Sequence, residues 1–359
     1  MTEQSIRKMY DKLAVKRDNF CDRAEECAEL TLPAVLPYDG FSSSSQLYTP
    51  FQSVGARGVN NLASKLLLLL LPPNQPFFRL SVSGKTQQEL ETQPELKTDI
   101  EKSLAKLERR VMKFIEENAI RVPVFEALKH LLITGNVLLH MSKDSKMKLY
   151  NIEQYVVNRD AYGNLLQIVI KESVSPLTFD EETRMLCQIT DNSEDVDLYT
   201  NIQLQKDGKY HTEQQCNMVT IPKSIGSFKS EDLPFMPLRM IRIENEDYGR
   251  SYVEEFLGDL KSLEGLSKAL LQASAAMSKV VFMVRPNATT KKRDLVESQN
   301  GDIITGSKED VDVLQAEKYY DLQVVERSIK SLTERLGYVF LLQSAVTRDA
   351  ERVTAEEIR

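Results

Sequence analysis

The stretch that comes nearest to a known chemical motif is GDIITGSK, Gly301 to Lys308, which has the Gly-x-x-x-x-Gly spacing of a P-loop. A P-loop continues with Lys and then Ser or Thr, because the ammonium group reaches the phosphates and the hydroxyl binds Mg²⁺. Here Ser307 precedes the lysine, and the acidic Glu309 and Asp310 follow where a helix N-terminus would meet a phosphate. The sequence therefore argues against a nucleotidase, and we expect an ATPase assay to show no turnover.

Metal and nucleophilic chemistry have no support in the spacing of the reactive residues. The chain has four cysteines and three histidines, with no Cys-x-x-Cys or His-x-x-x-His pair that would suggest zinc. No Gly-x-Ser-x-Gly, His-Glu-x-x-His or dinucleotide-binding fingerprint occurs. Cys21 and Cys27 lie in a helical pattern and are predicted to be buried thiols, and His130 is predicted to be a structural or surface residue and not a ligand. We expect no enzymatic activity, no cofactor and no metal.

A run of cations, Lys291-Lys292-Arg293, lies between two long helical patterns near the end of the chain. A short charge run is usually a solvated loop. Its position at the tip between two helices also suits the docking of a partner protein. Both interpretations stay open at this point.

Composition is that of an ordinary globular protein, with 42% hydrophobic and 28% charged residues and a net charge of −7. The charge predicts no general attraction to nucleic acid or to an anionic membrane. The charged N-terminus predicts no signal peptide. Leu66 to Leu71 form an apolar run, but a membrane span needs about 20 residues, so we expect no membrane insertion. We interpret the run as the end of a helix buried on all sides and stopped by Pro72-Pro73.

The sequence pattern of the first 250 residues predicts an α+β fold, in which several helices are followed by a strand-rich module at about 136–243. Apolar periodicity predicts helices over 3–30, 53–71 and 87–119, and a fourth that Pro123 opens and Gly135 closes. The third helix, 87–119, should bury one apolar face. The segment FFRLSV, 77–82, is predicted to form a short strand. The strand-rich module should be a small antiparallel barrel or sandwich, with a hairpin turn in which Gly163 has a positive φ. The expected buried face of the third helix consists of Leu104, Leu107, Val111, Phe114 and Ile115.

Two long helices are predicted in the last third of the chain, over 251–282 and about 317–342. The first would span about 48 Å at 1.5 Å per residue. The apolar seam of each helix is narrow, so the pair is better buried in a ring of neighbouring copies than alone.

Several long stretches resemble the head–tail connector, or portal, family of T7-like short-tailed bacteriophages. The similarity covers the whole chain in order, and so is far more specific than a short motif. The stretches are YTPFQSVGARGVNNLASKL (48–66), VFEALKHLLITGNVLLH (124–140), YVVNRDAYGNLLQIV (155–169), DYGRSYVEEFLGDLKSLEGL (247–266) and LLQSAVTRDAERVTAEEIR (341–359).

The resemblance implies a dodecamer at one capsid vertex of the virion, assembled in the host cytoplasm. It implies a passive channel for double-stranded DNA in packaging and ejection, and contacts with terminase, tail adaptor, scaffolding and major capsid proteins. The implied parts are a wing (1–250), a first stem helix (251–282), a clip (283–316), a second stem helix (317–342), a tunnel loop (343–353) and the start of a truncated helix (354–359). The family's C-terminal crown would be absent. The alternative is another ring-forming virion protein that does not conduct DNA.

Under this resemblance, four cations are candidates for transient contacts with DNA phosphates: Arg348 and Arg352 in the loop, and Lys330 and Arg335 on the second stem helix. The two loop arginines could instead pair with Asp349, Glu351 or a neighbouring subunit. Lys291, Lys292 and Arg293 would be docking residues of the clip. Thr354 to Glu357 match a capping box, so a helix should begin there.

Overall fold

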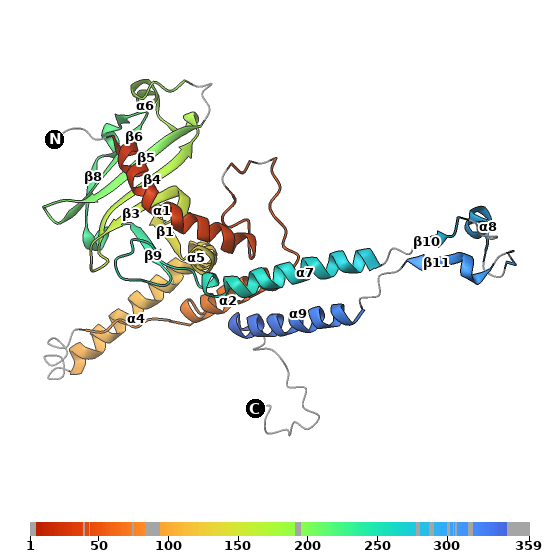
Figure 1. The fold of residues 1–359 in the computed structure, drawn as a ribbon. Coiled ribbons are helices and arrows are strands. Elements are labelled where there is room, and N and C mark those ends of the chain that lie inside the picture. Colours follow the sequence, from red (N-terminus) through yellow and green to blue (C-terminus); the bar gives the residue numbers. More distant parts are fainter. Residues whose placement is uncertain are drawn as a thin grey trace. The chain divides into compact units, whose positions relative to one another are not determined.

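The structure of the protein is a computed structural model that describes residues 5–38, 40–42, 44–73, 75–82, 94–190, 195–277, 281–286, 291–299, 302–303, 305, 307–314 and 319–342. The chain forms two compact units, Met1–Gly258 with Gly337–Arg359, and Asp259–Leu336. The helices labelled in Figure 1 are α1 (Ile6–Glu29), α2 (Val54–Leu70), α4 (Pro94–Glu117), α5 (Arg121–Thr134), α6 (Glu181–Leu186), α7 (Leu257–Met277), α8 (Lys292–Glu297) and α9 (Tyr319–Val339). The strands are β1 (Asn136–Met141), β2 (Met147–Tyr150), β3 (Tyr155–Arg159), β4 (Leu165–Val174), β5 (Val196–Leu204), β6 (Lys209–Cys216), β7 (Val219–Thr220), β8 (Gly226–Lys229), β9 (Phe235–Arg239), β10 (Val281–Val284) and β11 (Val311–Leu314).

The strand-rich module of the first unit consists of two antiparallel sheets, which confirms the α+β class. One sheet has the order β2-β1-β9, and the other the order β3-β4-β5-β6-β7, with β8 also paired to β6. The predicted hairpin joins β3 to β4. Its turn is closed by a hydrogen bond from Gly163 N to Asp160 O of 2.9 Å, and Gly163 has a φ of +87°. The glycine confirms the sequence prediction, because an L side chain rarely adopts this conformation.

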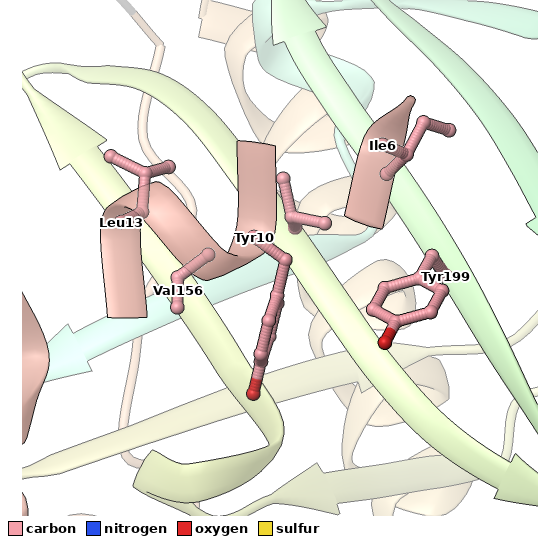
Figure 2. Packing of buried hydrophobic residues seen from close by; sticks show 6 residues of the cluster. Ile6, Tyr10, Leu13, Val156 and Tyr199 are labelled. Atoms are coloured by element: carbon pink, nitrogen blue, oxygen red, sulfur yellow. The ribbon is translucent and has the colours of Figure 1, made fainter. Parts of the chain in front are cut away.

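Helix α1 packs across the larger sheet and builds its core (Figure 2). The stripe of Ile6, Tyr10 and Leu13 recurs every three or four residues, so it forms one face of the helix. This face meets Val156, Val169 and Tyr199, which come from three adjacent strands. The Tyr10 hydroxyl donates to Glu153 O at 2.6 Å, which satisfies the polar end of a buried ring.

The smaller sheet is covered by α5, whose C-terminus is set by Gly135. This residue has a φ of +74°, and its N–H donates to Leu131 O at 3.0 Å, as in a left-handed helix cap. The chain then enters β1 directly, and Val137 and Leu139 pack against Ala127 of the helix. The predicted end of this helix is confirmed.

Two predictions of buried helical faces are wrong for the single chain. Only the first half of α2 is buried, and Leu69 near its end has 78% of its surface exposed, with Leu68 and Leu70 also exposed. On α4, Leu107, Val111 and Phe114 are exposed, although their spacing is that of an apolar stripe. Periodicity identifies which residues share a face, but it does not say whether another part of the same chain covers that face.

Two boundary predictions also need correction. Residues 77–82 form no strand, and the helix expected over 251–282 ends at Met277. Val281–Val284 instead form β10, which pairs with β11 in the second unit. Val, Phe and Met are compatible with either a helix or a strand, so periodicity alone did not separate the two here.

The prediction of buried thiols is confirmed for Cys21 and Cys27, which are buried and form no disulfide. Cys187 and Cys216 are buried as well and form no disulfide. Burial raises the pKa of the Cys21 thiol to about 11. None of the described helices contains a stretch long and apolar enough to cross a membrane.

Candidate channel and docking sites

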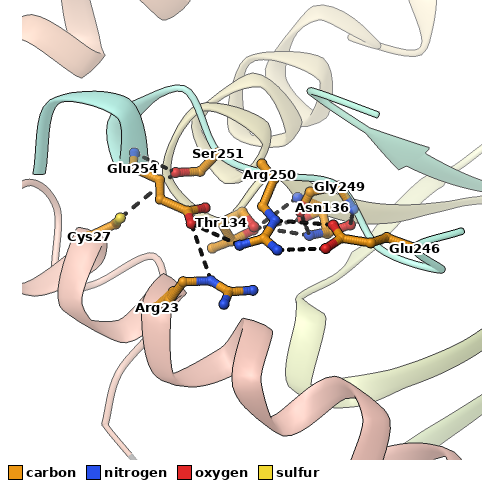
Figure 3. Close-up of polar contacts among 9 residues, drawn as sticks. All are labelled: Arg23, Cys27, Thr134, Asn136, Glu246, Gly249, Arg250, Ser251 and Glu254. Atoms are coloured by element: carbon orange, nitrogen blue, oxygen red, sulfur yellow. Dashed lines mark hydrogen bonds and ion pairs between the residues drawn. The ribbon is translucent and has the colours of Figure 1, made fainter. Parts of the chain in front are cut away.

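The first of the two long helices is held at its start by a buried asparagine that follows α5. Asn136 has 1% of its surface exposed, and its Nδ2 donates to Gly249 O at 2.8 Å and to Thr134 O at 3.0 Å (Figure 3). Its Oδ1 accepts from Gly249 N at 2.7 Å. One side chain therefore satisfies both backbone groups of Gly249, and it fixes the segment that leads into α7 against the α5–β1 corner.

An ion-pair network surrounds this junction (Figure 3). The Arg250 guanidinium lies between Glu246, at 2.5 Å, and Glu254, at 3.1 Å, and the hydrogen bond to Glu246 is the main cause of its raised pKa. Arg23 of α1 reaches Glu254 at 3.2 Å. Ser251 Oγ accepts from Glu254 N at 2.8 Å, which satisfies a backbone N–H in the first turn of the 3-10 helix Val253–Phe256 before α7. The start of the long helix is therefore tied to α1 as well as to α5.

The second long helix is anchored at its end by Phe340, which is fully buried in the first unit. A Cβ built on Gly58 of α2 would lie 2.5 Å from Phe340 Cγ, so only glycine allows this approach. Asn61 Nδ2 donates to Phe340 O at 2.9 Å, and Lys65 Nζ donates to Leu341 O at 2.7 Å. These bonds satisfy carbonyls that a helix end leaves without partners. Leu341 has a φ of +54°, so the chain turns sharply where α9 has ended.

The two candidate channel cations on α9 have different surroundings. Arg335 Nη2 lies 2.5 Å from Asp259 Oδ1 of α7 within the second unit, so its charge is partly neutralised. Lys330 is exposed and has no ion pair within the described ranges. The two residues are five positions apart and so lie on different faces of the helix. Their proposed contact with DNA stays a prediction.

The candidate docking cations lie at the start of α8, and the charge of one of them is already engaged. Arg293 Nε pairs with Glu297 Oε1 at 2.9 Å, four residues along the helix, and both side chains are exposed. Lys291 is exposed, and the surroundings of the Lys292 side chain are not among the described features. The free charge of the cluster is therefore smaller than its sequence suggests. Arg348, Arg352, and the capping box at Thr354 to Glu357 lie outside the described residues.

The P-loop-like stretch has no phosphate-binding geometry where the structure describes it. Ser307 Oγ accepts from Glu309 N, and Asp310 Oδ2 accepts from Ser307 N, so the hydroxyl and the carboxylate cap their own short turn. In the part of the chain that the structure describes, no three His, Cys, Asp or Glu side chains gather as a metal site would require. A described hollow of about 480 Å³ is lined by Arg7, Asp195, Val196, Asp197, Tyr199, Gln215, Asn217 and Met218. This lining offers no Ser, Cys or His nucleophile–base pair.

The residues that anchor both long helices were not identified by sequence reasoning. Asn136, Gly58 and Phe340 belong to no local motif, and their partners are more than 100 residues away in the chain. One indirect indication of the role of Asn136 was present in the sequence. This residue directly follows the glycine that ends a helix, so a polar side chain stands at the start of the next strand.

Comparison with known proteins gives matches along the whole chain. The family described as "Bacteriophage head to tail connecting protein" matches residues 3–359. The portal protein of Escherichia phage T7 is 40% identical over 369 residues, which cover 100% of this chain and 69% of the relative. The portal protein of Enterobacteria phage T3 is 40% identical over 99% of this chain and 68% of the relative, and that of Enterobacteria phage SP6 is 34% identical over 99% and 69%.

Among solved structures, the virion of a native gene transfer agent particle matches 66% of this chain and 60% of that chain at 13% identity, with a TM-score of 0.34. That likeness is too weak to support any argument here. The family match and the identity to three phage proteins are independent of it, and they show that this chain belongs to the bacteriophage head-to-tail connecting proteins.

Proposed function

We propose that this protein forms a ring of twelve copies at one vertex of a phage capsid, where it joins head to tail. DNA would pass through the ring in packaging and in ejection. The observation that carries this proposal is the 40% identity to the T7 portal protein along the entire chain. Its partners would be its own copies, double-stranded DNA, terminase, a tail adaptor, and the scaffolding and major capsid proteins. It would reside in the virion and, during assembly, in the host cytoplasm.

The division into functional parts is proposed on the same basis. Residues 1–250 would be the wing, and α7 and α9, within 251–282 and 317–342, the two stem helices. The clip would be 283–316, and β10 and β11, which pair with each other, would close its base. The tunnel loop would be 343–353, and 354–359 the start of a further helix.

A channel that lets DNA pass should hold its phosphates weakly. Each phosphate that a cation neutralises adds affinity, so a chain of net charge −7 with few free cations suits low friction. The ion pair of Arg335 with Asp259 supports this, because it leaves Lys330 as the freer cation on α9. Arg348 and Arg352 would make transient phosphate contacts from the loop.

The loop contacts can be tested by replacing Arg348 and Arg352 with alanine in the phage. We expect rings to assemble and the packaged genome to be shorter or poorly retained. Packaging and retention equal to those of the unaltered phage would contradict the role of these arginines.

The docking role of the clip predicts that reversing Lys291, Lys292 and Arg293 to glutamate weakens binding of terminase or tail adaptor in a pull-down. Reversing Arg293 alone should have the smaller effect, because Glu297 already neutralises it. Unchanged binding by the triple variant, with the ring intact, would contradict this role.

The whole proposal is tested by averaged electron microscopy of the purified particle. We expect a ring whose bore admits a DNA duplex, whose major groove alone is about 12 Å wide. A ring with a narrower bore would favour a virion protein that does not conduct DNA.

A further inference from the structure

Two guanidinium groups converge on the hairpin turn between β3 and β4. A Cβ built on Gly163 would lie 2.9 Å from Arg239 Nη2 and 3.1 Å from Arg242 Cζ. The glycine therefore leaves the space that these two side chains occupy. Both arginines come from the segment at and after β9, about 80 residues further along the chain.

A third arginine, Arg159 at the end of β3, belongs to the same cluster. Burial lowers the pKa of Arg159, and the charge of Arg239 lowers it further. Burial likewise lowers the pKa of Arg239, followed by the charge of Arg242. Three positive charges thus lie within electrostatic reach of one another, and like charges so placed repel.

The guanidinium groups of this cluster bind backbone carbonyls, and their positive charge is offset only in part, by the nearby Asp247. In the described part of the chain none of the three forms an ion pair with a carboxylate, and the nearby Asp247 accepts from the Arg159 backbone N at 2.7 Å. The bonds are Arg159 Nε to Asp247 O (3.1 Å), Nη1 to Gly163 O (3.2 Å) and Nη2 to Pro237 O (2.8 Å), Arg239 Nη1 to Glu246 O (2.9 Å), and Arg242 Nη2 to Tyr162 O (2.7 Å).

The same chain carries a complementary surface on the second half of α1. At 100° per residue, five carboxylates lie on one arc of this helix, and like charges spaced four residues apart repel. Asp18, Asp22 and Glu29 are exposed and form no ion pair among the described residues. We call this surface the acidic row, and its members are Asp18, Asp22, Glu25, Glu26 and Glu29.

The two surfaces do not pair within one chain, since no described ion pair joins a residue of the arginine cluster to one of the acidic row. Arg23 of α1 pairs instead with Glu254, and Arg250 pairs with Glu246 and Glu254. The arginine cluster, and Asp18, Asp22 and Glu29 of the acidic row, are therefore available to another molecule.

We propose that the arginine cluster of one copy (Arg159, Arg239 and Arg242) binds the acidic row of α1 in the next copy. This rests on the proposed ring and names one contact that builds it. Because the two surfaces differ, the contact is head-to-tail, and repetition around a closing rotation gives a ring. Tyr162, which is 83% exposed at the tip of the same hairpin, adds an aromatic anchor, and Tyr and Arg are among the residues enriched at interface hot spots.

Carboxylates of a second copy fit this cluster better than DNA does. Binding to duplex DNA depends on cations spread along the phosphate backbone, whereas these guanidinium groups converge on one hairpin turn. A chain with a net charge of −7 repels DNA, but it supplies abundant carboxylates to its own copies.

The test is a charge swap in the full chain, followed by native mass spectrometry and electron microscopy. We expect Arg239→Glu with Arg242→Glu to raise the concentration needed for ring assembly on the order of tenfold or more, since like charges across an interface are strongly unfavourable. Asp18→Lys with Asp22→Lys should do the same, and the four changes together should restore assembly. The control, Lys206→Glu in the β5–β6 turn with Lys209→Glu at the start of β6, changes two exposed residues by the same charge and should leave assembly unaltered.

Circular dichroism of each variant separates misfolding from loss of contact, and restoration by the combined swap requires folded chains. If the unaltered chain and both reversed variants form rings equally well, this contact is refuted while the proposed function stands. Rings that persist in the arginine variant with loss of DNA binding would also refute it, in favour of a nucleic-acid site. Absence of rings from the unaltered chain would overturn both proposals.

Discussion

Replacing Gly58 with alanine should loosen the anchor at the end of α9. The new Cβ would lie 2.5, 2.6 and 2.8 Å from three Phe340 carbons, whereas carbon atoms pack best at about 3.5–4.0 Å, so the ring must move by about 1 Å. Phe340 has little freedom to move, because it is fully buried and Asn61 holds its carbonyl. Overpacking of this kind costs about 1–3 kcal/mol. Alanine in a helix gains about 1 kcal/mol over glycine, so the net loss is up to about 2 kcal/mol.

Gly265 of α7 supplies the matched control, because nothing lies within 4 Å of a Cβ built there. Gly265→Ala keeps only the helix-propensity gain of about 1 kcal/mol, so the two variants should differ by about 1–3 kcal/mol. Hydrogen exchange by mass spectrometry measures the free energy of local opening in peptides that cover α2 and residues 337–342 for Gly58→Ala, and α7 for Gly265→Ala. Adding Phe340→Leu to Gly58→Ala should recover part of the loss, which a double-mutant cycle detects. If Gly58→Ala stabilises its helix as much as Gly265→Ala does, the close approach of Phe340 is refuted.

Three further predictions concern buried polar groups. Asn136→Ala should lower the free energy of unfolding by about 1–3 kcal/mol for each Gly249 backbone group left without a partner, and a thermal melt unchanged from that of the unaltered protein would contradict this. Burial lowers the pKa of His130 to about 4, below its unfolded value of about 6.5. The unfolded state then binds more protons, so stability should fall as pH decreases from about 6.5 to 4, and His130→Gln should reduce this slope in denaturant titrations. All four thiols should react with a thiol reagent at pH 8 only after denaturation, because they are buried and burial raises the pKa of Cys21 to about 11. Rapid labelling of the folded protein at pH 8 would contradict the burial of these thiols.

The sequence predicted best those features that depend on neighbouring residues. The ends of α5 and of the β3–β4 hairpin follow from Gly135 and Gly163, whose positive φ values only a glycine adopts without strain. The apolar stripe on α1 followed from its helical period, and the burial of Cys21 and Cys27 followed from their place in the same helical pattern. The resemblance to portal proteins, which rested on long stretches and not on short motifs, is confirmed by the family match over residues 3–359.

Predictions were less successful where they depended on which other segment of the chain packs against a residue. Leu69 on α2 and Leu107 on α4 have the right type and spacing for a core, but no described part of the chain covers them. The apolar residues 281–284 join a strand because β11 lies beside them, and periodicity carries no information about that neighbour. The roles predicted for Lys330, Arg335 and Lys291 remain predictions, although the ion pair of Arg335 with Asp259 became visible only in the structure.

From the sequence alone came the long helices, the position of the strand-rich module, the turns at Gly135 and Gly163, and the family to which the chain belongs. These features are encoded in residues a few positions apart and in long collinear similarity. Only the tertiary structure showed that Phe340 needs Gly58, that Asn136 holds Gly249, and that Arg239 and Arg242 converge on Gly163. Each of these contacts joins residues about 80 or more positions apart, and its energy depends on distances that exist only once the chain has folded.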